Sequence, residues 1–344
     1  MASPSDAARA LHLDSLAELT DTERAVLGDV STGRALASFD RYTADRLGQP
    51  IRAIIFRAGR IDAVWGVELD DGREVVIKTH RLPVDLRAVN SARAAMALLR
   101  RDGFPCPAPL SGPDEVGGRV LTIDTLVRGE AIPDARLAAV RRLLAVGLAR
   151  HIGVLRQDPG LREPAGAGPS WCRYQWGPWP VPHDPIVDFR SCPQGYAWLD
   201  AYARKASGQL LTHRHGQEVV VGHADWYAGN VVVAHGELAG SYDWELVADT
   251  EAVIAGFSAA GFASSSTSGE GLSTPEEVVA FLQDYEVARG LPFSVSEQKA
   301  AAAAAGWIVA FNARWEVALR GDRGEGATTA LLRDRRADYL TLSW

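Results

Sequence analysis

The stretch GHADWYAGNVVVAHGELAGSYDW, residues 222–244, decides how this chain is interpreted. Its second half, VVVAHGELAGSYDW, predicts a β-hairpin that turns at His235 and Gly236, because two Val- and Leu-containing runs flank a glycine turn. Such a hairpin brings Asn230, just before its first arm, close to Asp243, at the end of its second arm. Polar side chains far apart in the sequence are thus expected at one end of the hairpin.

A carboxylate precedes the hairpin. Asp225 lies in the loop that leads into Asn230, so one amide oxygen and two carboxylates, the second from Asp243, converge on one patch. Mg²⁺ takes hard oxygen ligands and usually binds one or two carboxylates, sharing its other positions with phosphates and water. The stretch therefore predicts a magnesium–phosphate site. The alternative that stays open is a surface strand–turn–strand in which Asp and Asn serve the turns.

The spacing of these residues narrows the choice. His223, Asp225 and Asn230 follow the pattern H-x-D-x-x-x-x-N, and Asp243 comes after the next strand–turn–strand. In the catalytic loop of protein kinases this Asp accepts the hydroxyl proton, the Asn holds Mg²⁺, and a second metal-binding Asp follows. Asp225 is therefore the catalytic candidate, and Asn230 and Asp243 are the candidate metal ligands. We expect a structural hydrogen-bonding role for His223.

Three strand-like runs upstream, IRAIIF, AVWGVEL and EVVIKTH, form a β-meander over residues 51–79. Lys78 lies near the end of the third run. Only three of the 36 basic residues are lysines, which favours a functional ammonium group over a solvated strand end. A helical sequence at 84–102 and two further strand-like runs follow, so the order up to residue 127 is β-β-β-α-β-β.

HADWYAGN followed by SYDWE resembles the aminoglycoside phosphotransferase, or choline-kinase-like, superfamily. The resemblance extends in order of elements from about residue 50 to the end of the chain. It implies an α+β, two-lobed protein-kinase-like fold with a small antiparallel-β N-lobe and a mainly helical C-lobe. We expect a helical N-terminal extension at 1–50, the N-lobe at 51–127, and the C-lobe at 128–344.

The same resemblance implies an ATP-dependent O-phosphotransferase that uses Mg²⁺ at the metal candidates named above. Asp225 would orient and deprotonate the acceptor hydroxyl. Lys78 would contact the α- and β-phosphates of ATP, and the backbone of Asp124–Leu126 would hydrogen-bond the adenine edge. GTP in place of ATP stays open.

Two departures from the family pattern stand out. Family members carry an acidic residue on the helix after the third strand, where it pairs with the lysine. The corresponding run 84–102 offers no Glu, and its one early acid, Asp85, sits at the helix start. Lys78 is therefore expected to pair differently. Val253 replaces the second acid that usually follows Asp249, which should alter local packing more than chemistry.

The acceptor site is expected in the C-lobe. Glu245, Trp315 and Glu316 are candidate substrate residues; solvent-facing or packing roles are their alternatives. The chain from 243 to 344 has 15 acidic and eight basic residues, which favours an amino-substituted acceptor such as an aminoglycoside, amino sugar or amino alcohol. The segment 157–195 is long and rich in Pro, Gly and Trp, and we expect its tryptophans to tie it to the body of the protein.

Composition and charge argue against several other classes of protein. The chain has 344 residues, 47% hydrophobic and 23% charged, and a net charge of −7, which argues against nucleic acid as a main partner. No apolar run is long enough for a membrane span, and the N-terminal sequence lacks a signal-peptide pattern, so a cytoplasmic protein is expected. Three scattered cysteines without a C-x-x-C spacing predict neither a disulfide framework nor a zinc site.

The sequence thus predicts a small-molecule kinase of the antibiotic-resistance type, with its oligomeric state undetermined. A metabolic kinase for sugars or choline-like alcohols stays open, because acceptor choice lies in variable surfaces. A nucleotide-binding protein with little transfer activity is a further alternative, suggested by the missing helix acid. A kinase of protein substrates is disfavoured by the lack of a multi-glycine phosphate loop.

Overall fold

The Val- and Ile-rich runs between residues 51 and 125 form one antiparallel five-stranded sheet with the spatial order β1-β2-β3-β5-β4. Side chains alternate across β3, so Val75 and Ile77 lie on the buried face and Lys78 on the opposite face. The bounds in this region are α2 (Asp21–Leu27), α3 (Thr32–Leu47), β1 (Ile51–Ala58), β2 (Ala63–Leu69), β3 (Glu74–His80), α4 (Leu86–Arg101), β4 (Pro109–Val116) and β5 (Arg119–Thr125).

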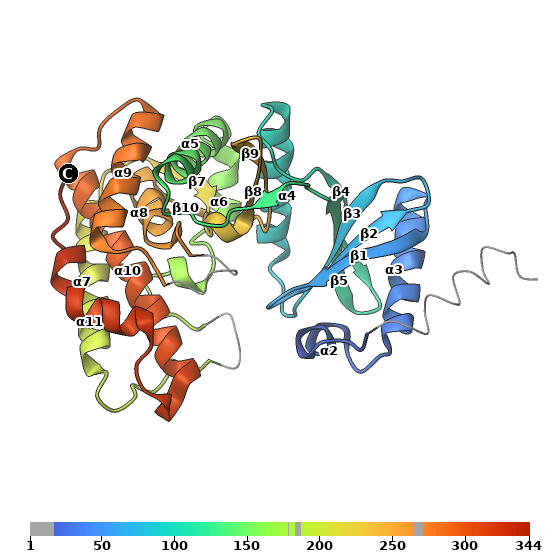
Figure 1. Ribbon diagram of the computed structural model, residues 1–344, viewed down its shortest axis with the longest axis horizontal. Coiled ribbons are helices and arrows are strands. Elements are labelled where there is room, and N and C mark those ends of the chain that lie inside the picture. The colour runs from blue at the N-terminus through green and yellow to red at the C-terminus, as the bar shows by residue number, and fades with distance from the viewer. Residues whose placement is uncertain (1–16, 178, 183–186, 265–270) are drawn as a thin grey trace, which may run out of the picture. The chain divides into compact units, whose positions relative to one another are not determined.

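Helices α2 and α3 cover the buried face of this sheet (Figure 1). Thr20 and Glu23 form a capping box at the start of α2, the Thr-x-x-Glu pattern that is typical of helix starts. Phe39 of α3 packs edge-on against Trp65 of β2, with ring centroids 5.1 Å apart, and both side chains are buried. The described helices of the stretch expected as a separate extension, 1–50, therefore share the core of the sheet.

The computed structural model describes residues 17–177, 179–182, 187–264 and 271–344. The chain divides into two compact units. The first contains the described residues up to Asn90 together with Pro107–Val127, and the second contains Ser91–Cys106 and Arg128–Trp344. Most of α4 thus groups with the second unit, because Met96, Leu99 and Phe104 belong to that unit's hydrophobic core.

The second unit is mainly helical, so the predicted α+β class is confirmed. Strand β7 pairs with β10 antiparallel, and β6, β8 and β9 form a small antiparallel sheet. Strand β10 was not predicted. The bounds are β6 (Glu130–Ala131), α5 (Ala138–Leu155), α6 (Arg162–Ala165), α7 (Ala197–His213), β7 (Val219–His223), β8 (Val231–Ala234), β9 (Glu237–Ser241), β10 (Leu246–Thr250), α8 (Glu251–Gly261), α9 (Pro275–Arg289), α10 (Val295–Arg320) and α11 (Ala327–Tyr339).

Helix α10 lies at the centre of the second unit and packs against α7, α8 and α11. Its alanine run from Ala300 to Ala305 is buried, which lets α8 approach closely. A Cβ at Gly256 of α8 would come within 2.3 Å of the Ala301 carbonyl oxygen and 2.7 Å of the Ala304 Cβ. Small residues on both helices are therefore required for this contact. None of the helices in the described part of the chain is both long and apolar enough to span a bilayer.

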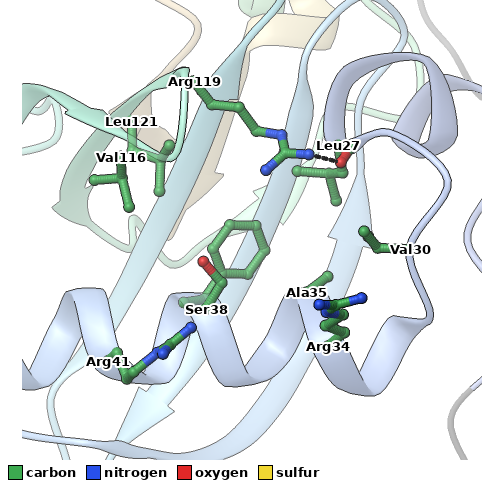
Figure 2. Close-up of a pocket in the computed structure, with 10 residues that line it drawn as sticks. Leu27, Val30, Arg34, Ala35, Ser38, Arg41, Val116, Arg119 and Leu121 are labelled. Carbon is green, nitrogen blue, oxygen red and sulfur yellow. Dashed lines mark hydrogen bonds between the residues drawn. The ribbon is translucent and has the colours of Figure 1, made fainter.

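A cavity of about 150 Å³ lies between α3 and the β4–β5 hairpin of the first unit (Figure 2). Its floor is apolar and its rim carries arginines, of which Arg119 donates to the carbonyl oxygen of Leu27. The lining residues are Leu27, Val30, Arg34, Ala35, Ser38, Phe39, Arg41, Val116, Arg119 and Leu121. No site residue expected from the sequence is among them.

The ion pair between Glu23 of α2 and Arg57 of β1 should hold α2 on the sheet. Arg57 Nε donates to Oε1 of Glu23 at 2.8 Å and Nη2 donates to Oε2 at 2.5 Å, while the guanidinium lies 5.0 Å from the Trp65 ring centroid. Glu23→Ala removes the counter-charge of the largely buried Arg57 guanidinium and the carboxylate that accepts from the Thr20 N–H, so the free energy of unfolding should fall by roughly 3 kcal/mol in urea titrations. Asp21→Asn, which changes an exposed carboxylate on the same helix, should change it by under about 0.5 kcal/mol. Equal losses in both variants would contradict this role for the pair.

Candidate active site

The predicted hairpin is present. Strands β8 and β9 are joined by His235 and Gly236, whose φ angles are 53° and 78°, the left-handed values of a type I′ turn. At its open end the N–H of Tyr242 donates to the carbonyl oxygen of Asn230 at 3.0 Å. Asn230 is therefore directly opposite the residue before Asp243, which confirms that the hairpin brings these two parts of the chain together.

The loop between β7 and β8, which carries the catalytic candidate, is held from several sides. The Trp226 side chain is buried, and its Nε1 donates to the carbonyl oxygen of Leu144 on α5 at 2.9 Å. The N–H of Ala224 donates to the Glu245 carbonyl oxygen at 2.7 Å, and Trp171 Nε1 donates to the Ala224 carbonyl oxygen at 3.2 Å. These contacts fix the loop backbone, as a site that depends on positioning requires.

Asn230 orients Asp225. The amide nitrogen Nδ2 of Asn230 donates to the Asp225 carbonyl oxygen at 3.0 Å and to its carboxylate Oδ2 at 2.9 Å. Because both donor hydrogens of the amide point at Asp225, the carbonyl oxygen Oδ1 of Asn230 faces away from it. The buried amide thus fixes the carboxylate of Asp225, which is half-buried, and presents an oxygen of the type that Mg²⁺ accepts.

Asp243 is exposed and adopts a left-handed backbone conformation with φ of 56°. Among non-glycine residues Asp tolerates this region better than most, and such residues gather at functional sites. No group of three or more His, Cys, Asp and Glu side chains in the described ranges is arranged as a metal site. A divalent ion held by Asn230 and Asp243 would complete its shell with phosphate oxygens and water, which fits one amide and one carboxylate.

The His223 side chain is hydrogen-bonded both to the loop that carries Asp225 and to the segment that leads into Asp243. Its Nδ1 accepts from the N–H of Asp225 at 3.1 Å, so Nε2 carries the proton and donates to the Tyr242 carbonyl oxygen at 3.2 Å. Burial lowers the pKa of His223 to about 4, and the opposing effects of the Tyr242 carbonyl and the Asp243 charge are smaller. The ring is therefore neutral near pH 7 and has the structural hydrogen-bonding role expected of it.

An aromatic cluster lies beneath these loops. Trp226 and Trp244 are buried, with ring centroids 5.8 and 4.7 Å from that of His223. The N–H of His223 donates to Nε2 of the buried His151 at 3.2 Å. Burial, with a smaller contribution from repulsion by a protonated His223, holds the pKa of His151 well below its usual range. Sequence reasoning missed His151, because no local pattern connects residues 72 positions apart.

In the first unit, Lys78 pairs with a residue that the sequence did not single out. Lys78 Nζ lies 3.1 Å from Oδ2 of Asp62, which is in the turn between β1 and β2. Helix α4 contains neither Asp nor Glu, as expected from the sequence. The signal that could have found Asp62 is an acid in the β1–β2 turn of a chain whose following helix offers none.

The segment expected to meet adenine is paired within the sheet. The N–H groups of Thr125 and Leu126 donate to the carbonyl oxygens of Ala108 and Glu74, each at 3.0 Å. Asp124 belongs to β5 and pairs with β3 and β4. The adenine contact of Asp124 and Leu126 stays a prediction, and the N–H groups of Thr125 and Leu126 are already used within the sheet.

The acceptor candidates differ in their surroundings. Glu245 is exposed, next to the loop that holds Asp225. Trp315 is half-buried and lies 6.3 Å, between ring centroids, from Phe189. Glu316 accepts hydrogen bonds from the N–H and the hydroxyl of Thr329, at 2.8 and 2.6 Å, and so caps the start of α11. Glu245 is therefore the main candidate for a residue that binds the acceptor substrate.

The tryptophans of the long segment 157–195 tie it down, which confirms the expectation. Trp307 Nε1 of α10 donates to the Trp171 carbonyl oxygen at 2.7 Å. Trp179 Nε1 donates to Asp200 Oδ1 at 2.7 Å. The third tryptophan of the segment, Trp176, is not packed against the body of the protein in this way, because 58% of its surface is exposed.

Comparison with known proteins identifies the class. Residues 52–253 match the phosphotransferase enzyme family. No curated protein sequence matches the chain. Among solved structures, amicoumacin kinase hAmiN in complex with AMP-PNP, Ca²⁺ and Ami matches with a TM-score of 0.59 and 12% identity, over 90% of this chain and 96% of that one. Aminoglycoside phosphotransferase APH(4)-Ia matches with a TM-score of 0.56 and 12% identity, over 90% and 99%.

At such low identity these structural likenesses concern the fold alone, which is the protein-kinase-like fold of the two matched structures. The chain belongs to the phosphotransferase enzyme family, whose match covers more than half of its length. The predicted resemblance to the aminoglycoside phosphotransferase superfamily is confirmed, and with it the class of enzyme, a phosphotransferase.

The buried neutral His223 predicts that acid destabilises the protein. An unfolded histidine titrates near pH 6.5, whereas His223 in the folded protein titrates near 4. Between these values the unfolded state binds more protons, so the free energy of unfolding falls as pH decreases, by up to about 3 kcal/mol from this residue. His223→Gln should show a smaller loss between pH 7 and pH 4.5 in urea titrations. An unchanged pH slope in that variant would contradict a neutral buried imidazole.

Proposed function

We propose that this phosphotransferase moves the γ-phosphate of ATP, bound with Mg²⁺, to a hydroxyl group of a small molecule that carries amino groups. The observation that carries the proposal is the arrangement of Asp225, Asn230 and Asp243 around one end of a hairpin. Structures that share the fold include amicoumacin kinase with AMP-PNP and an APH(4)-Ia mutant with ADP and hygromycin B, which supports an aminoglycoside-like or amino-sugar acceptor.

Asp225 is proposed as the general base. Its carboxylate accepts the proton of the acceptor hydroxyl while the oxygen attacks the γ-phosphate. The amide of Asn230, which donates to Oδ2, fixes the orientation of this carboxylate before the acceptor binds. Because phosphoryl transfer needs little covalent work from the protein, this positioning accounts for much of the contribution of Asp225.

Asn230 Oδ1 and the Asp243 carboxylate are proposed to hold the magnesium ion, which when bound neutralises charge on the phosphates. The hydrogen bond from His223 to the Tyr242 carbonyl keeps the backbone beside Asp243 in register with the catalytic loop. In the first unit, Lys78 is proposed to bind the α- and β-phosphates, since an ammonium group is a compact point charge for phosphate oxygens. GTP in place of ATP is compatible with all of these roles.

The amino groups of the acceptor are inferred from charge next to the base. Glu245 is exposed, and its backbone carbonyl is hydrogen-bonded to Ala224, the neighbour of Asp225. A carboxylate beside the catalytic loop favours a cationic acceptor over a neutral sugar, because exposed charges of one sign attract the opposite charge during binding.

Substitutions at the two carboxylates should separate transfer from nucleotide binding. Asp225→Ala should abolish transfer while the affinity for Mg-AMP-PNP stays within about tenfold, since a general base contacts the acceptor. Asp243→Ala should remove the Mg²⁺ dependence of nucleotide binding, measured by calorimetry. Glu237→Gln, an exposed carboxylate on the same hairpin, is the matched control and should leave both properties unchanged. Wild-type turnover in both aspartate variants would refute the assignment.

The acceptor class can be read from ligand-induced stabilisation. A ligand that binds only the native state raises the melting temperature with its concentration. We expect ATP to stabilise the protein only when Mg²⁺ is present, and aminoglycosides or amino sugars to add to that shift. A further shift with choline or neutral sugars alone would instead identify a metabolic kinase. Stabilisation by nucleotide without turnover of any acceptor would indicate a nucleotide-binding protein.

A further inference from the structure

The ion pair between Lys78 and Asp62 lies on the face of the first unit's sheet that is turned away from α2 and α3. Lys78 is opposite Val64 in the β2–β3 register, so Asp62, which precedes β2, extends beside the end of β3. Side chains of Lys78 and Asp62 are each about one-fifth exposed, at 22% and 20%. Burial to this degree makes the ion pair stronger than one on an open surface.

Asp62 is itself held in place. Its Oδ1 accepts from the backbone N–H of Arg81 at 2.8 Å, and Nδ1 of His80 lies 3.7 Å from its Oδ2. The turn that carries it is tight, because Gly59 has a φ of 124° and a Cβ there would come 1.9 Å from the carbonyl oxygen of Asp62. The carboxylate is thus fixed by backbone geometry before it contacts Lys78.

We propose that Asp62 is the positioning residue for Lys78. It does the work that an acid on α4 would otherwise do, since α4 has no acidic residue. The inference rests on the proposed function, in which Lys78 binds the nucleotide phosphates. A lysine has a long flexible side chain, and an ion pair with a fixed carboxylate reduces the conformational freedom lost when a phosphate binds. An ammonium group has three donors, so a contact to one carboxylate oxygen and a contact to phosphate are compatible.

The test measures binding of Mg-AMP-PNP and of adenosine to the full-length protein. Asp62→Asn keeps an oxygen that can accept from the Arg81 N–H, so the turn is retained while the charge is lost; Asp62→Ser is the second variant should the first fail to fold. Asp71→Asn is the matched control, because Asp71 also accepts a backbone N–H and pairs with an arginine, but in the turn at the other end of the β2–β3 hairpin.

We expect Asp62→Asn to weaken Mg-AMP-PNP binding about tenfold and to leave adenosine binding within twofold, because only the phosphates use Lys78. In steady-state kinetics the KM for ATP should rise more than kcat falls. Lys78→Met should have an equal or larger effect, and adding Asp62→Asn to it should weaken binding no further. The Asp71 variant should bind both ligands as the wild type does.

Other outcomes separate the two proposals. If Lys78→Met weakens Mg-AMP-PNP binding and Asp62→Asn leaves it unchanged or tightens it, the positioning role is overturned while the proposed function stands. Equal loss of adenosine and AMP-PNP binding in Asp62→Asn would also overturn it, since that pattern indicates a general structural role. If the wild type binds no Mg-AMP-PNP, the proposed function fails, and this inference fails with it.

Discussion

The neutral ring of His223 is the constraint on which the candidate active site depends. One nitrogen accepts from the backbone of Asp225 and the other donates to the backbone beside Asp243, so a single side chain sets the spacing between the proposed base and a proposed metal ligand. Such a bridge works only when one nitrogen is deprotonated and the other protonated. Burial provides this state by lowering the pKa of the ring. The chemistry at the surface of the site therefore rests on exclusion of water from the layer beneath it.

That layer is aromatic and continuous with the core of the second unit. His151, Trp226 and Trp244 contact His223, Phe104 packs against these three, and the indole of Trp226 is hydrogen-bonded to α5. Large rigid side chains bury much area at low entropic cost and leave little freedom to the loops above them. The carboxylates of Asp225 and Asp243 are accordingly carried by loops whose neighbouring backbone groups, at Ala224, Asn230 and Tyr242, are hydrogen-bonded within the fold. This is the arrangement expected of an enzyme that works by positioning and charge.

Sequence reasoning found the parts of the site whose signals are local. The hairpin at His235 and Gly236, the order of strands around Lys78, and the capping box at Thr20 each depend on residues a few positions apart. Strand β10 escaped it, because LVADT lacks clear alternation and becomes a strand by pairing with β7. Glu316 is a candidate for binding the acceptor in the sequence, whereas its carboxylate accepts from the N–H of Thr329, 13 residues further on, at the start of α11. Contacts of that kind arise only when α10 and α11 pack.

The sequence by itself determined the class of the protein and the identity of its central polar residues. Asp225, Asn230 and Asp243 are brought together by a two-residue turn and by the two-residue period of the flanking strands. Both features depend on local steric preferences of the backbone. The tertiary structure alone decided that Asp62 pairs with Lys78, that His151 lies under His223, and that the N–H of Leu126 is taken up by the sheet. The physical reason is that a partner for a buried charge or donor is selected by three-dimensional proximity and desolvation, and these depend on packing between segments that no local pattern relates.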